Sequence, residues 1–318
     1  MESGIIPGDS YEPHSSVIEA TRDIREDGAG FQIIAASPSR RVWSLGHDFI
    51  VKEWLCPHDY DGAVEARASR LLRDRGVDIP VPAVKMHWKD GDWAFIVSQR
   101  LPGRPLSEIW DGLADEDRDR VAKQTADMIA GFRSIESELC SALDGGPVRD
   151  VNVQLTSEKS GNGRVRRSFG PLATEDEVWA QIFKPRLDAA GVDEEHQRTL
   201  RECMPSPTGG EPGSPSYPFT HGDLAFGNIL IEDGDGGMDV SGILDFEFSA
   251  YLPAWWEYLA AQFGCCRGDG EWKTLLRHYM EPNEHAVDWF LYWSELCKTP
   301  MPEDIDIWPQ ILAKYVKA

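Results

Sequence analysis

Three polar side chains suited to metal and proton chemistry fall within one stretch, HGDLAFGNILIEDGDGGMDVSGILDFEF, His221 to Phe248. They are Asp223, Asn228 and Asp245. Carboxylate and amide oxygens are the hard ligands that Mg²⁺ prefers, and a carboxylate that holds no metal can accept a proton. The residue types therefore indicate a site where a metal ion and a proton acceptor act together.

A β-hairpin is the element that must position these side chains. The pattern consists of an apolar run, a Gly/Asp-rich turn and an alternating return strand, at Ile229–Ile231, Asp233–Gly237 and Met238–Leu244. In an antiparallel hairpin the start of the first strand lies beside the end of the second. We therefore expect Asn228 and Asp245 to meet, with Asp223 in the loop just before them.

The motif resembles the catalytic core of protein-kinase-like phosphotransferases: H-x-D, an Asn five positions after the Asp, and a hairpin ending in apolar-apolar-Asp. Gly222, where protein kinases usually carry Arg, makes it similar to the aminoglycoside phosphotransferase and choline kinase group. The continuation EFSAYLPAWWEY resembles the fungal-type branch of that group. The resemblance implies that Asp223 is the base that orients an acceptor hydroxyl, while Asn228 and Asp245 hold Mg²⁺ on the nucleotide phosphates.

The stretch departs from the family pattern at two places. Ala225-Phe226 replaces a frequent His-Pro, and Phe246 replaces a frequent Trp, but neither change removes a charged or metal-binding group. We expect His221 to be a hydrogen-bonded brace for the catalytic loop and not a proton carrier. The competing interpretation is a surface hairpin whose motif letters coincide by chance.

A second predicted hairpin starts at Phe31, with strands at Val42–Leu45 and Phe49–Val51 around a Gly-His-Asp turn. By resemblance, Ser37–Arg41 replaces the glycine-rich loop of protein kinases, and its backbone N–H groups can bind phosphate. Lys52 follows the second strand, where the family places the lysine that contacts the α- and β-phosphates. Its ammonium suits that role as a compact point charge.

A helix is predicted over Asp59–Arg75, with Gly76 as its stop. Glu65 falls in its first turns, and by resemblance an ion pair with Lys52 holds that lysine towards the phosphates. Without the family context, Lys52 would be a solvated charge at a strand end and Glu65 an ordinary carboxylate on a helix surface.

Two further strands, Val84–Trp88 and Trp93–Val97, complete a mostly antiparallel sheet. The following segment connects the two lobes, with a predicted boundary near residue 103. The resemblance implies that main-chain groups near Gln99 and Leu101 bind the adenine edge of a nucleotide.

The C-terminal part is predicted to be mainly helical. Helices are expected over Asp115–Ile135, 174–190 and 193–203, around Trp255–Phe263, and in the tail. Residues 144–170 are expected to form a loop with a basic patch, either a plain surface excursion or a lid. Which of the many C-terminal aromatic residues line an acceptor pocket stays open.

Composition sets the remaining expectations. No run of about 18 apolar residues and no secretion signal occurs, so we expect a cytoplasmic protein without a membrane span. The six cysteines have no C-x-x-C or zinc-like spacing, which favours free thiols. A formal net charge of −22 argues against a nucleic-acid partner and favours either cationic ligands or simple solubility.

These observations predict an α+β, bilobal protein-kinase-like fold, with a small antiparallel-sheet N-lobe and a larger, mainly helical C-lobe. Residues 1–30, with a weakly helical patch around Val17–Ile24, would form an N-terminal extension that packs loosely on the body. Residues 31–103 would form the nucleotide-binding N-lobe, and 104–318 the C-lobe. The expected activity is ATP- and Mg²⁺-dependent transfer of a γ-phosphoryl group to a hydroxyl of a small molecule. Two alternatives remain: a kinase-like scaffold used for other metabolite chemistry, and a catalytically idle ligand-binding relative.

Overall fold

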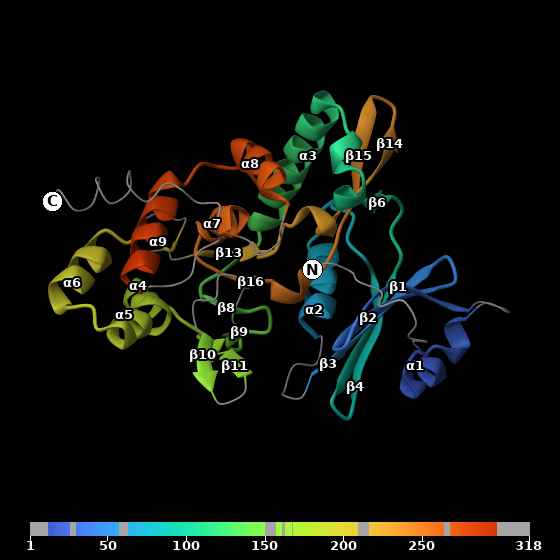
Figure 1. The fold of residues 1–318 in the computed structure, drawn as a ribbon, viewed down its shortest axis with the longest axis horizontal. Helices are drawn as coiled ribbons and strands as arrows, with labels where there is room; N and C mark the ends of the chain where they lie inside the picture. Colours follow the sequence, from blue (N-terminus) through green and yellow to red (C-terminus); the bar gives the residue numbers. More distant parts are fainter. Residues whose placement is uncertain are drawn as a thin grey trace.

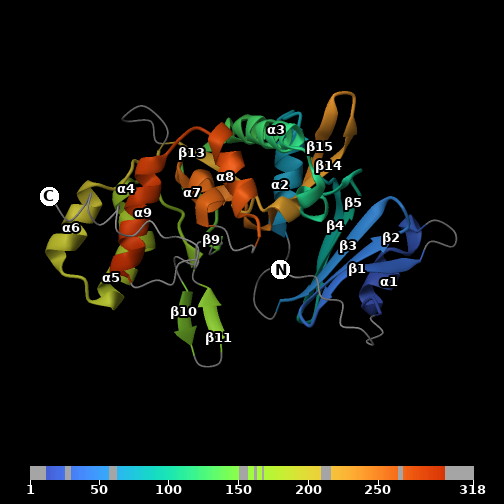
Figure 2. The same cartoon turned by 45° about the horizontal axis from the view of Figure 1, so that its top comes forward.

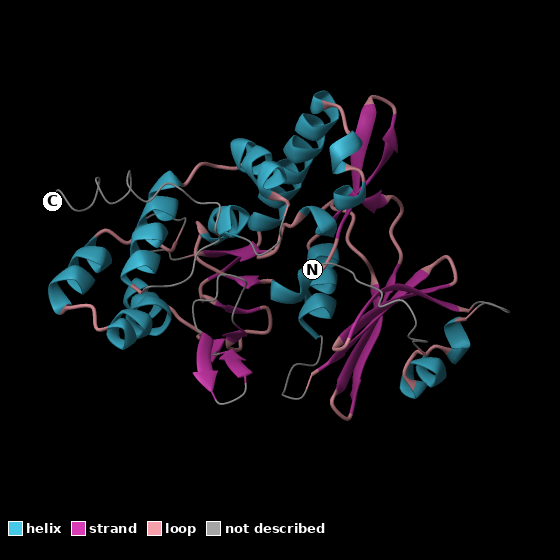
Figure 3. Ribbon diagram, viewed as in Figure 1, coloured by secondary structure: helices cyan, strands magenta, loops and turns pink. Residues whose placement is uncertain are grey.

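The structure, a computed structural model, has two lobes, an N-terminal sheet and a helix-rich C-terminal part (Figures 1 and 3). It describes residues 12–25, 30–56, 63–149, 157–160, 163–166, 168–208, 216–263 and 268–297. This arrangement is the predicted α+β, bilobal, kinase-like fold.

The N-terminal sheet has five antiparallel strands in the order β1-β2-β3-β5-β4. They are β1 (Phe31–Ser37), β2 (Arg40–Leu45), β3 (Phe49–Leu55), β4 (Val84–Asp90) and β5 (Trp93–Gln99). One face buries Trp43, Val51, Phe95 and Val97 in a small apolar core. Each strand predicted in this part of the sequence is present.

The N-terminal extension packs on this sheet more firmly than expected. Helix α1 (Ser15–Ala20) and the 3-10 turn Arg22–Ile24 lie where weak helical character was predicted. Val17 is completely buried and belongs to the apolar core of the sheet. Ser16 also accepts a hydrogen bond from Trp88 Nε1 at 3.3 Å. The expectation of loose packing was wrong for the described part of the extension, because Val17, the one buried side chain of α1, packs into the apolar core of the sheet.

Helix α2 (Ala63–Asp74) lies between the sheet and the C-terminal part (Figure 2). Its predicted start at Asp59 lies outside the described residues. Ala68 and Leu72 join the large core of the C-terminal part, so α2 belongs to the packing of both regions. The chain leaves the helix through Gly76, whose φ of 64° is the left-handed conformation expected after a helix end.

The connection between the lobes is hydrogen-bonded to the hairpin predicted between Asn228 and Asp245. Strand β6 (Arg104–Pro105) pairs with β14 (Ile229–Gly234), which pairs in turn with β15 (Gly237–Ile243). Gly103, with φ of 93°, passes so close to β14 that a Cβ would lie 2.7 Å from the Ile231 carbonyl oxygen. Only glycine fits this passage. The predicted lobe boundary near residue 103 falls here and stays a prediction.

The C-terminal part is built from helices around one large core. They are α3 (Asp115–Arg133), α4 (Glu175–Val178), α5 (Lys184–Ala190), α6 (Glu194–Glu202), α7 (Trp256–Phe263), α8 (Gly270–Tyr279) and α9 (Glu284–Leu296). A π-helical turn, Trp179–Phe183, joins α4 to α5, and 3-10 turns span Leu106–Glu108, Trp110–Gly112, Phe226–Asn228 and Phe246–Phe248. The predicted helices are therefore present, with α4 and α5 in place of the single helix expected over 174–190.

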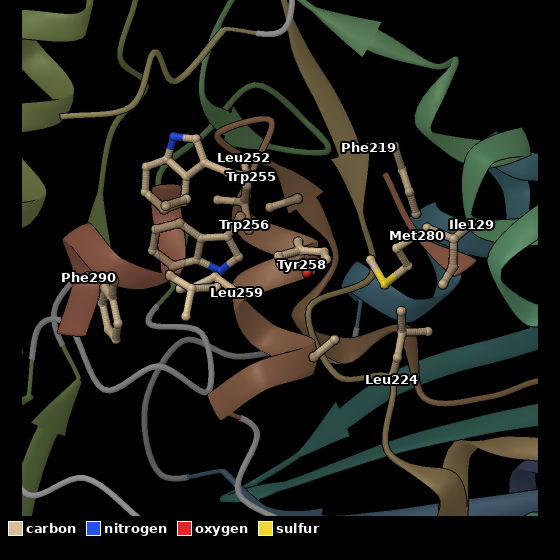
Figure 4. Packing of buried hydrophobic residues seen from close by; sticks show 14 of the residues in the cluster. Ile129, Phe219, Leu224, Leu252, Trp255, Trp256, Tyr258, Leu259, Met280 and Phe290 are labelled. Carbon is tan, nitrogen blue, oxygen red and sulfur yellow. The ribbon is translucent and has the colours of Figure 1, made fainter. Parts of the chain in front are cut away.

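Five tryptophans in the described portion of this part lie in the core and do not line an open pocket. Trp255, Trp256, Trp272, Trp289 and Trp293 are at most 1% exposed. Figure 4 shows Trp255 and Trp256 side by side, with Leu259 beside them. The question left open by the sequence is thus answered for these five residues, which stabilise the fold by burial of large apolar surfaces.

The segment predicted as a loop over 144–170 contains short strands. They are β9 (Val148–Arg149), β10 (Ser157–Ser160), β11 (Gly163–Arg166) and β12 (Ser168–Phe169), with β10 and β11 forming a hairpin. Four further short strands pair in the order β7-β13-β16-β8, namely β7 (Glu136–Ser137), β8 (Ser141–Ala142), β13 (Tyr217–Thr220) and β16 (Ala250–Tyr251). The loop prediction was wrong because polar strands without an apolar alternation give no strand signal.

Two smaller expectations concern cysteines and membranes. Cys56, Cys140, Cys203 and Cys297 are free thiols, and Cys265 and Cys266 lie outside the described residues. Within the described part of the chain, none of the helices has the length and apolar character needed to span a membrane.

Candidate active site

The hairpin β14–β15 brings Asn228 and Asp245 together as the sequence predicts. Ile229 faces Ile243 at the open end of the hairpin. One step further, the backbone N–H of Leu244 donates to the carbonyl oxygen of Asn228 at 2.8 Å. The two polar residues therefore leave the sheet at the same end, on neighbouring strands.

Asp223 is held beside Asn228 by direct hydrogen bonds. The Asn228 Nδ2 group donates to the Asp223 carbonyl oxygen at 2.9 Å and approaches its Oδ2 at 3.4 Å. The amide nitrogen of Asn228 thus faces Asp223, so its amide oxygen is directed elsewhere. The three predicted residues therefore lie at the same end of the hairpin.

His221 braces this loop through both ring nitrogens. Its Nδ1 accepts the backbone N–H of Asp223 at 3.1 Å, and its Nε2 lies 2.9 Å from the carbonyl oxygen of Leu244. The Nε2 position must therefore carry the proton of a neutral imidazole. Complete burial lowers the pKa of His221, which keeps the ring neutral. The brace predicted from the sequence is present in the geometry.

Glu257 is a part of the site that the sequence reasoning missed. Its carboxylate accepts the backbone N–H groups of His221, at 2.5 Å, and of Gly222, at 3.0 Å. The residue is fully buried on α7, and burial raises its pKa. One acidic residue in the apolar sequence WWEYLAAQF was a signal for such a role, because a buried carboxylate needs donors.

Gly222 is required by a close approach of two backbone segments. Its φ is 81°, and a Cβ at this position would lie 3.3 Å from the Phe248 carbonyl oxygen. Any side chain would combine an unfavourable left-handed backbone with a tight contact. The glycine of the H-G-D motif is therefore a structural requirement of this loop.

Lys52 joins the N-terminal sheet to the hairpin. Its Nζ lies 3.0 Å from Glu65 Oε2 and 2.9 Å from Asp245 Oδ1. Lys52 lies in the middle of β3 and not at a strand end, facing Val42 and Ile96 in register. Burial alone would lower the pKa of Lys52, but Asp245 and Glu65 outweigh it and raise the pKa. The predicted pair is therefore present, with Asp245 as a second partner of the lysine.

Arg40 and Glu247 complete the cluster, and neither was predicted. Arg40 Nη2 lies 3.2 Å from both carboxylate oxygens of Asp245, and its Nη1 lies 3.1 Å from Glu247 Oε1. Burial and the neighbouring Asp245 raise the pKa of Glu247 to about 7. The signals in the sequence were the position of Arg40 in the predicted phosphate loop and that of Glu247 two residues after Asp245.

Asp245 itself adopts a strained backbone conformation. Its φ of 66° and ψ of 57° lie in the left-handed region, and it is the only such non-glycine residue in the described part of the chain. Burial would raise the pKa of Asp245, but Lys52 and Arg40 outweigh burial and hold the pKa well below its usual range. Strain of this kind concentrates at functional sites, where the surrounding structure fixes it.

Helix α8 contacts the other side of the catalytic loop. Trp272 Nε1 donates to the Leu224 carbonyl oxygen at 3.0 Å. Beside it, Lys273 Nζ lies 3.0 Å from Asp269 Oδ2 in a buried ion pair. Burial raises the pKa of Asp269, and the negative charge of Asp223 adds to this effect. Polar residues of α8 were not among the predicted site residues.

Gln99 and Leu101, whose main-chain groups are predicted to bind an adenine, lie at the end of β5 and two residues after it. The backbone N–H of Gln99 already donates to Ala83 at 2.9 Å, so only its carbonyl oxygen is left for a base edge. The side chain of Leu101 packs over Gly242, where a Cβ would lie 2.6 Å from Leu101 Cδ1. Leu101 therefore borders the hairpin, whereas Gln99 is bonded to the segment before β4, and their contacts with a nucleotide stay a prediction.

The donor set suits a magnesium ion that is shared with phosphates. Among the described residues, no group of three or more His, Cys, Asp or Glu side chains could form a metal site by itself. Magnesium sites in phosphotransferases commonly use one or two protein ligands and complete the shell with phosphate oxygens and water. Asp245 and Asn228 match that pattern, and the ammonium of Lys52 lies beside Asp245.

Solved structures of phosphotransferases have a similar fold. The fold is similar to that of the streptomycin–ATP ternary complex of APH(2'')-IIa, at 14% identity and a TM-score of 0.53, over 97% of this chain and 98% of that one. It is also similar to ADP-bound aminoglycoside phosphotransferase APH(2'')-Ib, at 15% identity and a TM-score of 0.55, over 96% and 97% of the two chains. No curated protein matches the chain in sequence.

The sequence profile of APH, the phosphotransferase enzyme family, matches residues 31–290. The matched range contains the N-terminal sheet, the catalytic hairpin and most of the helical part. The chain therefore belongs to the APH phosphotransferase enzyme family.

Proposed function

We propose that the protein transfers the γ-phosphoryl group of ATP to a hydroxyl of a small molecule in a Mg²⁺-dependent reaction. The observation that carries this proposal is the convergence of Lys52, Asp245 and Asn228 beside Asp223. In phosphoryl transfer the protein mainly supplies positioning and charge neutralisation. These four residues provide a cation for phosphate, two metal ligands and a proton acceptor.

The proposed metal ligands are Asp245 and the amide oxygen of Asn228. A bound Mg²⁺ would neutralise charge that develops on the phosphates. Lys52 would contact the α- and β-phosphates, and Glu65 would keep its ammonium oriented. The carbonyl oxygen of Gln99 and main-chain groups of Leu101 would bind the base edge, which fits their place at the connection between the lobes.

Asp223 is the proposed base. Its backbone is fixed by His221 at one end and by Asn228 at the other. The carboxylate is therefore carried by a loop with little freedom, as a group that must meet an acceptor hydroxyl requires. The proton of that hydroxyl would pass to the Asp223 carboxylate as the phosphoryl group arrives.

The nucleotide is proposed to be ATP, although proteins of similar fold contain either adenine or guanine nucleotides. The complexes named above contain ATP and ADP, and a structure of aminoglycoside 2'-phosphotransferase-IIIa, with a TM-score of 0.53 and 14% identity, contains GDP. The test must therefore include GTP beside ATP.

The acceptor is proposed to be a small cationic molecule with a free hydroxyl. Similar structures contain streptomycin and gentamicin. This chain carries 54 acidic against 32 basic residues, a balance whose field attracts cations. The same acidity would also serve solubility, so the charge of the acceptor needs its own measurement.

A nucleotide-binding experiment tests the function directly. Thermal unfolding is measured with ATP, GTP or neither, each with and without Mg²⁺. A ligand that binds only the folded state raises the melting temperature, so Mg²⁺ and ATP together should stabilise the wild type. Asp245→Asn should lose the part of the stabilisation that depends on Mg²⁺. Absence of any shift or binding heat with Mg·ATP and Mg·GTP would remove the basis of the proposal.

A further inference from the structure

Arg40 joins the N-terminal sheet to the end of the hairpin β14–β15. It begins β2, directly after the turn that replaces the glycine-rich loop, and reaches two carboxylates of the C-terminal part. The guanidinium bridges Asp245 and Glu247 with three contacts of 3.1 to 3.2 Å. Its side chain is only 23% exposed, so the contact is not an ordinary surface ion pair.

The guanidinium occupies the oxygen atoms that a metal ion would need. Arg40 contacts Oδ1 and Oδ2 of Asp245, and Lys52 contacts Oδ1 as well. Magnesium binds oxygen at about 2.0–2.1 Å in a nearly octahedral shell, which leaves no room for a guanidinium on the same edge of the carboxylate. Arg40 cannot withdraw by losing its proton, because arginine stays charged in proteins. It has to move.

The charges of the cluster explain why a cation is needed there at all. Asp245, Glu247 and Glu65 are three carboxylates, and Lys52 and Arg40 are the two cations that contact them. Removal of Arg40 would leave Glu247 beside Asp245 without the cation that bridges them. Buried carboxylates without a counter-charge are strongly unfavourable, so the loss of Arg40 has to be met by uptake of a proton or by binding of another cation.

We propose that Arg40 is an internal stand-in for the metal ion: it holds the cation position between Asp245 and Glu247 in the free protein, and metal–nucleotide binding has to displace it. This inference rests on the proposed function, since it takes Asp245 as a metal ligand. The contacts of Arg40 would then tie the start of β2 to the hairpin, and the arrival of the metal ion would release them.

The test measures the binding of Mn²⁺ alone, without nucleotide, by the electron paramagnetic resonance signal of the free ion. Arg40→Gln removes the positive charge that competes with the metal ion and keeps a polar side chain of similar length. We expect the Mn²⁺ affinity of this variant to exceed that of the wild type by roughly tenfold, because the metal ion no longer has to break a partly buried ion pair. Addition of Asp245→Asn to Arg40→Gln should abolish the gain.

Arg41→Gln is the matched control. Arg41 is the next residue of β2 and is 20% exposed, but it faces Glu53 and lies over the ring of Trp93. Its substitution should leave Mn²⁺ affinity unchanged. The full-length protein is used for every variant.

Thermal unfolding separates a stand-in from an ordinary structural ion pair. In EDTA, Arg40→Gln should unfold at a lower temperature than the wild type, and saturating Mn²⁺ should restore most of the difference by mass action. A Mn²⁺ affinity equal to or below that of the wild type, or a deficit that Mn²⁺ does not reduce, would overturn the proposal.

Arg40→Lys keeps the test decisive if Arg40→Gln does not fold. A single ammonium on a shorter side chain cannot bridge both carboxylates, so an intermediate gain in Mn²⁺ affinity is expected. No gain would overturn the proposal. Failure of the function itself has a different signature: the wild type would not bind Mg·ATP or Mg·GTP, while the comparison of Arg40 variants in Mn²⁺ would still give its result.

Discussion

Glu257 accepts the backbone N–H of Gly222 at 3.0 Å, although the two residues are 35 positions apart in the chain. The same carboxylate accepts the N–H of His221, so a fully buried side chain of α7 fixes two consecutive peptide groups of the catalytic loop. A loop with φ of 81° at Gly222 needs such support, because its peptide N–H groups point into the interior. The position of Asp223 therefore depends on the core of the C-terminal part.

Substitution of Glu257 should destabilise the whole protein. Glu257→Gln replaces one acceptor oxygen by an NH₂ group that faces a backbone donor, which leaves buried polar groups unsatisfied. The expected loss in the free energy of unfolding is about 1.5–3 kcal/mol, measured by urea denaturation. Glu195→Gln, an exposed change on α6, should cost less than about 0.5 kcal/mol. Equal effects of the two changes would contradict the anchoring role.

Asp223→Asn should separate catalysis from nucleotide binding. The proposed base contacts the acceptor and not the nucleotide, so turnover should fall by roughly 10²-fold or more while the dissociation constant of Mg·ATP stays the same. Single-turnover kinetics and calorimetry give the two values. Unchanged turnover would assign the base to another residue, and a matching loss of ATP affinity would move Asp223 to the nucleotide.

Much of the site could be predicted because its residues are close in sequence or follow a register. Asn228 and Asp245 meet through one hairpin, and hairpin pairing can be read from turn residues and strand alternation. Lys52 and Glu65 required the family resemblance as well, since an isolated lysine on a strand has no distinctive pattern. Four of the five strands of the N-terminal sheet were predicted for the same reason as the hairpin, whereas β1 was recognised only as a strand-like start at Phe31.

The missed residues act through long-range contacts. Arg40 reaches Asp245 over 205 positions, and Glu257 reaches the loop 35 to 36 positions before it. Neither spacing follows a helical or strand period, so only the packed structure brings these groups together. Val17 was misjudged for a related reason, because burial of one apolar residue depends on which surface the rest of the fold leaves open.

A double-mutant cycle should detect coupling between Lys52 and Glu65. The two charges lie 3.0 Å apart and are 13% and 7% exposed, so solvent screens them weakly. Lys52→Met, Glu65→Gln and the double variant should give a coupling free energy of about 1–3 kcal/mol in unfolding measurements. Glu65→Gln should also weaken Mg·ATP binding, because Lys52 loses the partner that orients it. Additive effects would show that the pair contributes no coupling.

The buried histidine should make the protein sensitive to mild acid. The pKa of His221 is lowered by burial from its ordinary value of 6.5, so the unfolded chain takes up a proton near pH 6.5 while the folded protein does not. The contribution of His221 to stability should therefore fall as the pH drops below 6.5, by up to roughly 1.4 kcal/mol per pH unit. Proton uptake by Glu247, whose pKa is raised to about 7, acts in the opposite direction and is common to the wild type and a His221 variant.

Urea denaturation at pH 7.5 and 5.5 checks this dependence. His221→Gln should be less stable at both values but lose less stability between them than the wild type. His278→Gln, a change at an exposed histidine, should leave the loss in place. If the wild type and His221→Gln lose the same amount, another group is responsible for the sensitivity to acid.

The charge of the acceptor can be decided by a salt series. If acceptor binding relies on the acidic field of the chain, its dissociation constant should rise between low salt and about 0.5 M salt, where the Debye length falls to roughly 4 Å. An apolar acceptor would bind equally well or slightly more tightly at high salt. The buried tryptophans of the C-terminal part do not support an apolar acceptor, because they are packed in the core and cannot stack on a ligand. A dissociation constant that does not change across the series would exclude an electrostatic origin of acceptor binding.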